Sequence, residues 1–147
     1  MKKINLGCGS DIREGWENFD ICPRDDEVKK LNLNELPLPF ETNSCDVILA
    51  SHVIEHLDIP PREFVKELQR IVKDDGRIVV RLPTWSNKVN HNRVWHCISY
   101  FNGIGRYGLM VKKRRGNQFS LLLMMKRFLA LLRDMSYQEY EYILEKK

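Results

Sequence analysis

Residues 4–10, Ile-Asn-Leu-Gly-Cys-Gly-Ser, are the stretch from which the fold is predicted. Residues 3–6 predict a short strand, and Gly7 and Gly9 follow it directly. Glycine lets the backbone turn sharply and come close to a ligand. By itself Gly-x-Gly also fits a plain tight turn. Position 12 holds no glycine, so the G-x-G-x-x-G pattern of dinucleotide-binding proteins is incomplete.

Asp20 adds to this interpretation, because it ends a second predicted strand at residues 16–21. The carboxyl ends of parallel strands share one edge of a sheet, where ligands of open α/β folds bind. A carboxylate there can accept hydrogen bonds from both ribose hydroxyls of a nucleoside. The alternative is a simple turn residue before Cys22. The gap of about ten residues after the glycines is shorter than the roughly twenty of a dinucleotide site.

The rest of the first half predicts alternating strands and one helix. Residues 46–50 are nearly all apolar, as in a parallel strand buried on both faces. Asp58 is the expected N-cap of the helix and Gly76 its expected C-terminal glycine. Apolar residues recur between them on one helical face: Phe64, Val65, Leu68, Ile71 and Val72. Further strands are predicted at residues 28–33 and 77–82, so a crossover helix joins parallel strands.

Beyond Pro83 the pattern is weaker. Residues 119–132 form an apolar run too short for a membrane span, which needs about 20 residues, so we expect a buried or interfacial helix. Residues 137–144 fit either a helix end or a final edge strand. The other elements expected are a helix at residues 94–101, a strand at 108–113 and a helix over 119–133.

Charge is unevenly distributed along the 147 residues. Residues 1–105 carry 14 Lys and Arg against 16 Asp and Glu, whereas residues 106–147 carry 10 against 4. A basic segment indicates either an acidic partner or a solvated basic face. Four scattered cysteines and no signal peptide favour a reduced, cytoplasmic protein. The length and composition predict a single globular domain over residues 1–147.

Six segments in unbroken order, from residue 3 to about residue 85, resemble class I methyltransferases that use S-adenosylmethionine (SAM), in particular the type 11 group. They are Ile-Asn-Leu-Gly-Cys-Gly-Ser from residue 4, Gly-Trp-Glu-Asn-Phe-Asp-Ile from 15, Leu-Pro-Leu-Pro-Phe from 36, Cys-Asp-Val-Ile from 45, Ser-His-Val-Ile-Glu-His-Leu from 51, and Glu-Leu-Gln-Arg-Ile-Val-Lys-Asp-Asp-Gly from 67. The resemblance implies a Rossmann-like, open, mostly parallel sheet with flanking helices, and methyl transfer from SAM as the function.

The resemblance also implies a set of cofactor-binding residues. Gly7, Cys8 and Gly9 would wrap the methionine half of SAM, and Asp20 would bind its ribose. The remaining residues would line the adenine or the reacting sulfur: Ile21, Asn32 and Leu33 at the adenine, and Ser51 and His52 near the methionyl group. Asn32 replaces the usual Asp, so it keeps a carbonyl acceptor without the charge.

His52 is the one candidate for a catalytic residue, as a general base on a substrate hydroxyl or amine. Alternatively His52 only lines the cofactor pocket while His56 anchors the next loop. Methyl transfer relies largely on positioning, so no base is obligatory. His91, His96 and Cys97, with Cys45, match no metal-ligand spacing, and no metal is expected.

The methyl acceptor cannot be read from the sequence. Aromatic residues at positions 85–107 fit either an acceptor pocket or a core patch. Family members usually carry an N-terminal helical segment that closes over the site. Its absence suggests that the lid is either missing or supplied by another chain, such as a second copy joined through residues 119–132. The alternative functions are a catalytically silent SAM-binding or assembly module and, with less support, a nicotinamide-dependent oxidoreductase.

Overall fold

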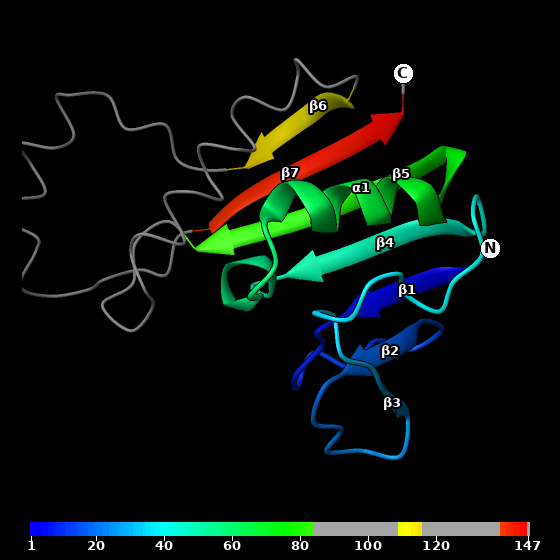
Figure 1. Ribbon diagram of the computed structural model, residues 1–147, viewed down its shortest axis with the longest axis vertical. Helices are drawn as coiled ribbons and strands as arrows, with labels where there is room; N and C mark the ends of the chain where they lie inside the picture. Colours follow the sequence, from blue (N-terminus) through cyan, green and yellow to red (C-terminus); the bar gives the residue numbers. More distant parts are fainter. Residues whose placement is uncertain (84–108, 116–138, 147) are drawn as a thin grey trace, which may run out of the picture.

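The computed structural model describes residues 1–83, 109–115 and 139–146. Within these ranges the strands form one seven-stranded sheet of order β3-β2-β1-β4-β5-β7-β6 (Figure 1). The strands are β1 (Lys3–Leu6), β2 (Glu17–Asp20), β3 (Val28–Lys30), β4 (Cys45–Ser51), β5 (Val72–Pro83), β6 (Leu109–Arg115) and β7 (Glu139–Lys146). A 3-10 turn, η1 (Ile54–His56), and a helix, α1 (Pro61–Ile71), lie between β4 and β5. The open, mostly parallel α/β sheet expected from the sequence is therefore confirmed.

Strands β1 to β5 pair in parallel, whereas β7 pairs antiparallel with both β5 and β6. Residues 137–144 were expected to form either a helix end or a final edge strand. A strand is present, β7, but it does not lie at the edge of the sheet. Ile78–Pro83 of β5 pair with one side of β7, and β6 pairs with the other side. The edge is β6, so β7 is an inner strand with hydrogen-bonding partners on both flanks.

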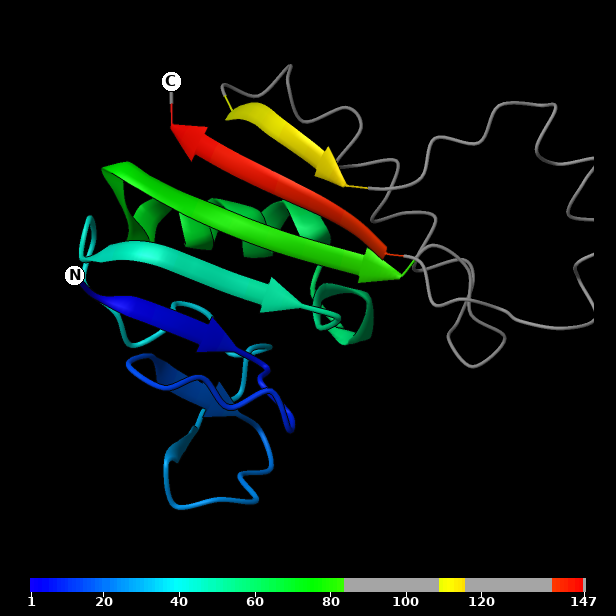
Figure 2. The same cartoon turned by 180° about the vertical axis from the view of Figure 1, so that it is seen from behind.

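Helix α1 packs against one face of the sheet. Figures 1 and 2 show that, among the described elements, no helix covers the other face. Side chains alternate between the two faces of a strand, so every second residue of β1, β4 and β5 points toward the helix. Burying these apolar side chains provides the main driving force for the fold. The shared core comprises Ile4, Leu6, Ile48, Ala50, Ile78, Val80 and Leu82 from the strands and Phe64, Val65, Leu68 and Ile71 from α1.

Helix α1 starts later than the sequence suggested, because Asp58 is not its N-cap. Pro60 holds that position in extended geometry (φ −61°, ψ 140°), and no side chain caps the helix. A residue before proline is pushed out of helical geometry, so Pro61 prevents the helix from beginning earlier. Proline at the first helical position loses no hydrogen bond, because the amide there has no intrahelical partner.

The helix also ends five residues before Gly76, so the predicted C-terminal glycine is wrong. Val72 is already extended, and the carbonyls of Arg70 and Ile71 accept hydrogen bonds from the backbone amides of Asn43 and Ser44 (2.9 Å each). Gly76 instead lies in β5, where a Cβ would come within 2.9 Å of the Asp46 carbonyl oxygen. It is thus needed for the close approach of β5 to β4 at an irregularity in their pairing.

Several other predictions can be placed. The third strand is shorter than expected and ends at Lys30. In the described ranges no helix is long and apolar enough to cross a membrane. Cys8, Cys22 and Cys45 are free thiols. The predicted helices at residues 94–101 and 119–133, the aromatic residues at 85–107, and His91, His96 and Cys97 lie outside the described residues.

Candidate functional site

The loop after β1 has a backbone that favours glycine at two positions. Gly7 has φ +65° and Gly9 has φ +53°, in the left-handed region that other residues rarely adopt. At Gly7 a Cβ would also come within 2.2 Å of Val53 Cγ2, whereas at Gly9 nothing lies within 4 Å. Gly7 is therefore required by packing as well as by conformation, and Gly9 borders open space.

Asp20, at the carboxyl end of β2, reaches across to this loop. Its Oδ2 accepts a hydrogen bond from the Gly9 amide (2.8 Å), and its Oδ1 accepts one from the Cys22 amide (3.0 Å). The carboxylate thus joins the glycine loop to the segment that follows β2. Each oxygen keeps further acceptor capacity for a ligand.

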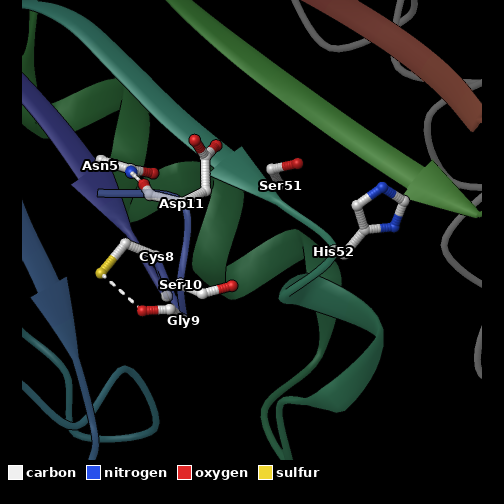
Figure 3. A pocket seen from close by; sticks show the side chains of 8 residues that line it. Asn5, Cys8, Gly9, Ser10, Asp11, Ser51 and His52 are labelled. Atoms are coloured by element: carbon white, nitrogen blue, oxygen red, sulfur yellow. Dashed lines mark hydrogen bonds between the residues drawn. The ribbon is translucent and has the colours of Figure 1, made fainter. Parts of the chain in front are cut away.

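Two hollows open at this edge of the sheet and share Gly7 and His52. The first, of about 300 Å³, lies around the glycine loop and is lined about equally by polar and apolar surface. Figure 3 shows its lining residues, with Ser51 and His52 at the end of β4 and the loop residues Cys8, Gly9 and Ser10 beside them. The second, of about 280 Å³, is more apolar and extends past Asp20 and Ile21 to Leu33 and Leu57. We call the two hollows together the groove; its end at the glycine loop is the more polar, and its end at Leu33 and Leu57 is the more apolar.

The structure brings all nine predicted cofactor-binding residues to these hollows. Cys8, Gly9 and Ser51 line the first hollow. Gly7 and His52 line both, and Asp20, Ile21, Asn32 and Leu33 line the second. Residues from four separate segments therefore converge on one groove, and what they bind there stays a prediction.

Asn32 is already partly engaged. Its Nδ2 donates to Glu35 Oε1 (2.8 Å), and its Oδ1 accepts from the Asn34 amide (3.1 Å). The side chain therefore caps its own turn while it faces the second hollow. One lone pair of Oδ1 is left for a donor on a ligand.

His52 stands out by its backbone, because it is a non-glycine residue with φ +55°. Its amide donates to the Arg81 carbonyl oxygen of β5 (3.0 Å), which fixes the bend after β4. Its Nδ1 lies 3.7 Å from Oε1 of Glu55, whose side chain is 1 % exposed. Unusual φ values persist where the surrounding structure holds them and are frequent at functional sites.

Cys8 lines the first hollow but is poorly suited to act as a nucleophile. Burial raises the pKa of its thiol, and the nearby carboxylate of Asp20 raises it further. A thiol is reactive mainly as the thiolate, so both effects keep Cys8 unreactive near neutral pH. Its place in the loop is explained by size and packing.

Sequence reasoning missed the residues that brace the glycine loop. Asn5 Nδ2 donates to the Asp11 carbonyl oxygen (2.7 Å) and to Asn18 Oδ1 (3.2 Å). Asn18 in turn accepts from the Arg13 amide (3.0 Å) and donates to the Arg13 carbonyl oxygen (3.1 Å). Both asparagines are almost fully buried. The available signal was a polar residue at the centre of each of two otherwise buried strands.

No group of three or more His, Cys, Asp or Glu within the described ranges is arranged to hold a metal ion. The candidates His91, His96 and Cys97 lie outside those ranges.

A methyltransferase-domain family model matches residues 17–80, which span β2 to most of β5. No curated protein sequence matches the chain significantly.

Solved structures extend the likeness to the whole fold. A protein described as a type 11 methyltransferase from Sulfolobus solfataricus aligns with a TM-score of 0.59 at 18% identity, covering 99% of this chain and 83% of that chain. A complex of the Haloferax volcanii Trm112 methyltransferase activator with a methyltransferase aligns at 0.61 and 16%, covering 99% and 82%. Geranyl diphosphate C-methyltransferase from Streptomyces coelicolor A3(2), crystallised with S-adenosyl-L-homocysteine, aligns at 0.62 and 14%, covering 99% and 72%.

Proposed function

We propose that this chain binds SAM in the groove at the carboxyl edge of its sheet and transfers the methyl group to an acceptor, as its similarity to methyltransferases in residues 17–80 and in fold implies. The supporting observation is the hydrogen bond between Asp20, which lines the second hollow, and the amide of Gly9, which lines the first. One carboxylate there can serve the ribose while the loop it holds serves the methionine half.

The residues present fit such a cofactor. Gly9 leaves open space above the loop, where backbone atoms can approach a ligand without a side chain between them. The apolar end of the groove, with the 52 % exposed Ile21 beside Asp20, suits a flat adenine ring. The polar end suits the amino and carboxylate groups of the methionine half. Bound SAM would supply a sulfonium methyl group, and the loop, Ser51 and His52 would orient it toward the acceptor.

Asn32 is assigned to the adenine amino group through the free lone pair of its Oδ1. A neutral, partly engaged oxygen attracts a donor less strongly than the carboxylate usual in the family. We therefore expect Asp20, not Asn32, to contribute most of the polar binding energy.

The test is calorimetric binding of SAM to wild type and to Asp20→Ala. Loss of a charged hydrogen-bond acceptor lowers affinity by about 10- to 100-fold. Asp25→Ala is the matched control, because Asp25 is an aspartate that likewise accepts the backbone amide two residues on (2.9 Å) yet lies outside both hollows. Equal SAM affinity for the two variants would refute the assigned role of Asp20, and failure of the wild type to bind SAM would refute the proposed function.

One observation favours the alternative of a SAM-binding or assembly module. Residues 7–16 and 21–27 contain no helix, so among the described elements no helix lies on the sheet face opposite α1 (Figure 2). A partner chain could complete the site there, and one similar structure is a methyltransferase bound to an activator. Tight SAM binding without methyl transfer to any component of a cell extract would favour this alternative.

A further inference from the structure

Glu55 is an acidic residue buried at the candidate site. The residue is 2 % exposed, and neither Oε1 nor Oε2 has a hydrogen-bond partner among the residues that the structure describes. Burying a carboxylate away from water is costly unless a charge or a donor compensates it. Packing alone does not explain a buried carboxylate at this position.

His52 lies beside this carboxylate. The Nδ1–Oε1 distance of 3.7 Å is within ion-pair range and slightly longer than a hydrogen bond. Catalytic hydrogen bonds are often long before substrate binds and shorten in the complex. The histidine lines both hollows, and its side chain is 25 % exposed. In Figure 3 its ring lies on the far side of Ser51 from the glycine loop, toward the end of β5.

From this geometry we propose that Glu55 is a positioning residue that holds His52 with its Nδ1 protonated and its Nε2 ready to accept a proton from the methyl acceptor. The proposal rests on the function proposed above. It assigns the acceptor to one chemical class: a molecule whose hydroxyl or amine must lose a proton as it is methylated.

The chemical step balances within these groups. The acceptor oxygen or nitrogen forms a bond to the methyl carbon, and its proton passes to Nε2 of His52. The bond between that carbon and the sulfonium sulfur breaks, and its electron pair stays on sulfur. The resulting imidazolium is stabilised by the Glu55 carboxylate and releases its proton to solvent before the next turnover. A buried carboxylate behind a histidine is an established way to fix the tautomer and stabilise the cation.

Other titratable groups lie on the elements around His52. Arg81 of β5 lies next to it, and that guanidinium is engaged by Glu141 of β7 (Nε–Oε2 3.0 Å). Among the described residues, the titratable groups on the elements around His52 are Glu55 and His56 of η1, Arg81 of β5 with its partner Glu141 of β7, and Cys8, Asp11 and Asp20 across the two hollows. Glu55 is the carboxylate whose substitution isolates the proposed interaction, because its two oxygens have no hydrogen bond to lose within residues 1–83, 109–115 and 139–146.

The test is NMR of the full-length protein labelled with ¹⁵N and ¹³C at histidine, with His52→Gln used to assign the His52 signals. We expect wild-type His52 to be neutral with the proton on Nδ1, and its titration midpoint to fall by about one pH unit in Glu55→Gln, since an opposite charge at this distance favours the cation. Glu63→Gln, at the exposed start of α1, is the matched control and leaves the midpoint unchanged.

The wild-type spectrum decides the proposal even if Glu55→Gln fails to fold. A proton on Nε2 instead of Nδ1 would overturn the proposal, and so would an equal midpoint in Glu55→Gln and wild type. These measurements need neither SAM nor an acceptor. Calorimetry with SAM alone tests the proposed function separately: we expect Glu55→Gln to bind SAM within about threefold of wild type, and a wild type that binds no SAM refutes that function whatever the tautomer.

Discussion

Two connecting segments of this molecule are fixed by different chemistry. Residues 38–42, which precede β4, are held by an ion pair on α1. The Glu67 carboxylate accepts from the Leu38 amide (2.7 Å) and from Arg70, and Arg70 donates to the carbonyl oxygens of Phe40 (2.8 Å) and Leu38 (3.1 Å). Residues 7–16, at the candidate site, are held mainly by the neutral amides of Asn5 and Asn18.

The difference follows from what each segment has to do. A buried ion pair fixes geometry firmly, but its charges act strongly on anything nearby in a low-dielectric setting. The segment before β4 borders neither hollow, so a fixed charge there is harmless. Under the proposed function, the glycine loop meets the charged ends of SAM. Neutral amides can brace that loop without competing for the ligand, which leaves Asp20 as the carboxylate bonded to the loop backbone.

The largest effect is expected at the loop itself, from Gly7→Ala. An alanine at φ +65° is strained, and its Cβ would overlap Val53. The two costs together lower the free energy of unfolding by roughly 3–4 kcal/mol. Gly9→Ala has a similar φ but open space, so it costs about 1 kcal/mol. Urea denaturation of the two variants measures the difference, and equal losses would show that Val53 does not fix the loop.

The second prediction tests whether the side chains of Asn5 and Asn18, which hold the glycine loop, must be uncharged. In Asn5→Asp the donating Nδ2 becomes an oxygen that faces the Asp11 carbonyl oxygen and Asn18 Oδ1. A buried carboxylate without donors lowers the free energy of unfolding by about 3 kcal/mol at pH 7. Asn34→Asp is the control, because Asn34 uses its Oδ1, which accepts from the Asp58 amide (2.8 Å), so the change stays below about 1 kcal/mol. If both variants lose the same stability, the neutral brace is not essential.

These braces also mark the limit of what the sequence could predict. The parallel strands, the glycine loop and the place of Asp20 follow from local patterns: apolar runs, Gly-x-Gly after a strand, and a carboxylate at a strand end. The end of α1 at Ile71 does not, because it depends on amides from residues 43 and 44 that approach from another segment. The Glu67–Arg70 pair has the spacing of an ordinary surface pair on a helix. Only the path of residues 38–42 shows that the carboxylate of this pair is largely buried.

The smallest of the three effects compares that pair with an exposed one. Glu67→Gln removes the charge from a carboxylate that is 10 % exposed and leaves Arg70, which is 30 % exposed, without its negatively charged partner. We expect a loss of about 2 kcal/mol at pH 7, below the usual cost of breaking a fully buried pair because water reaches Arg70. Glu17→Gln is the control: Glu17 pairs with Lys29 at 2.8 Å, but the two side chains are 37 % and 62 % exposed. Its loss stays below about 0.5 kcal/mol.

The pH dependence separates this ion pair from simple packing. The hydrogen bond from Arg70 lowers the pKa of Glu67 below its ordinary value of 4.5, although burial opposes the shift. A carboxyl group whose pKa is lower in the folded state stabilises the protein fully above the unfolded-state pKa, and that stabilisation is lost as the pH falls through the folded-state value. The difference in free energy of unfolding between wild type and Glu67→Gln should therefore be constant near neutral pH and should decrease below about pH 4.5. A stability difference that persists below this pH would mean that Glu67 holds residues 38–42 by its shape and not by its charge.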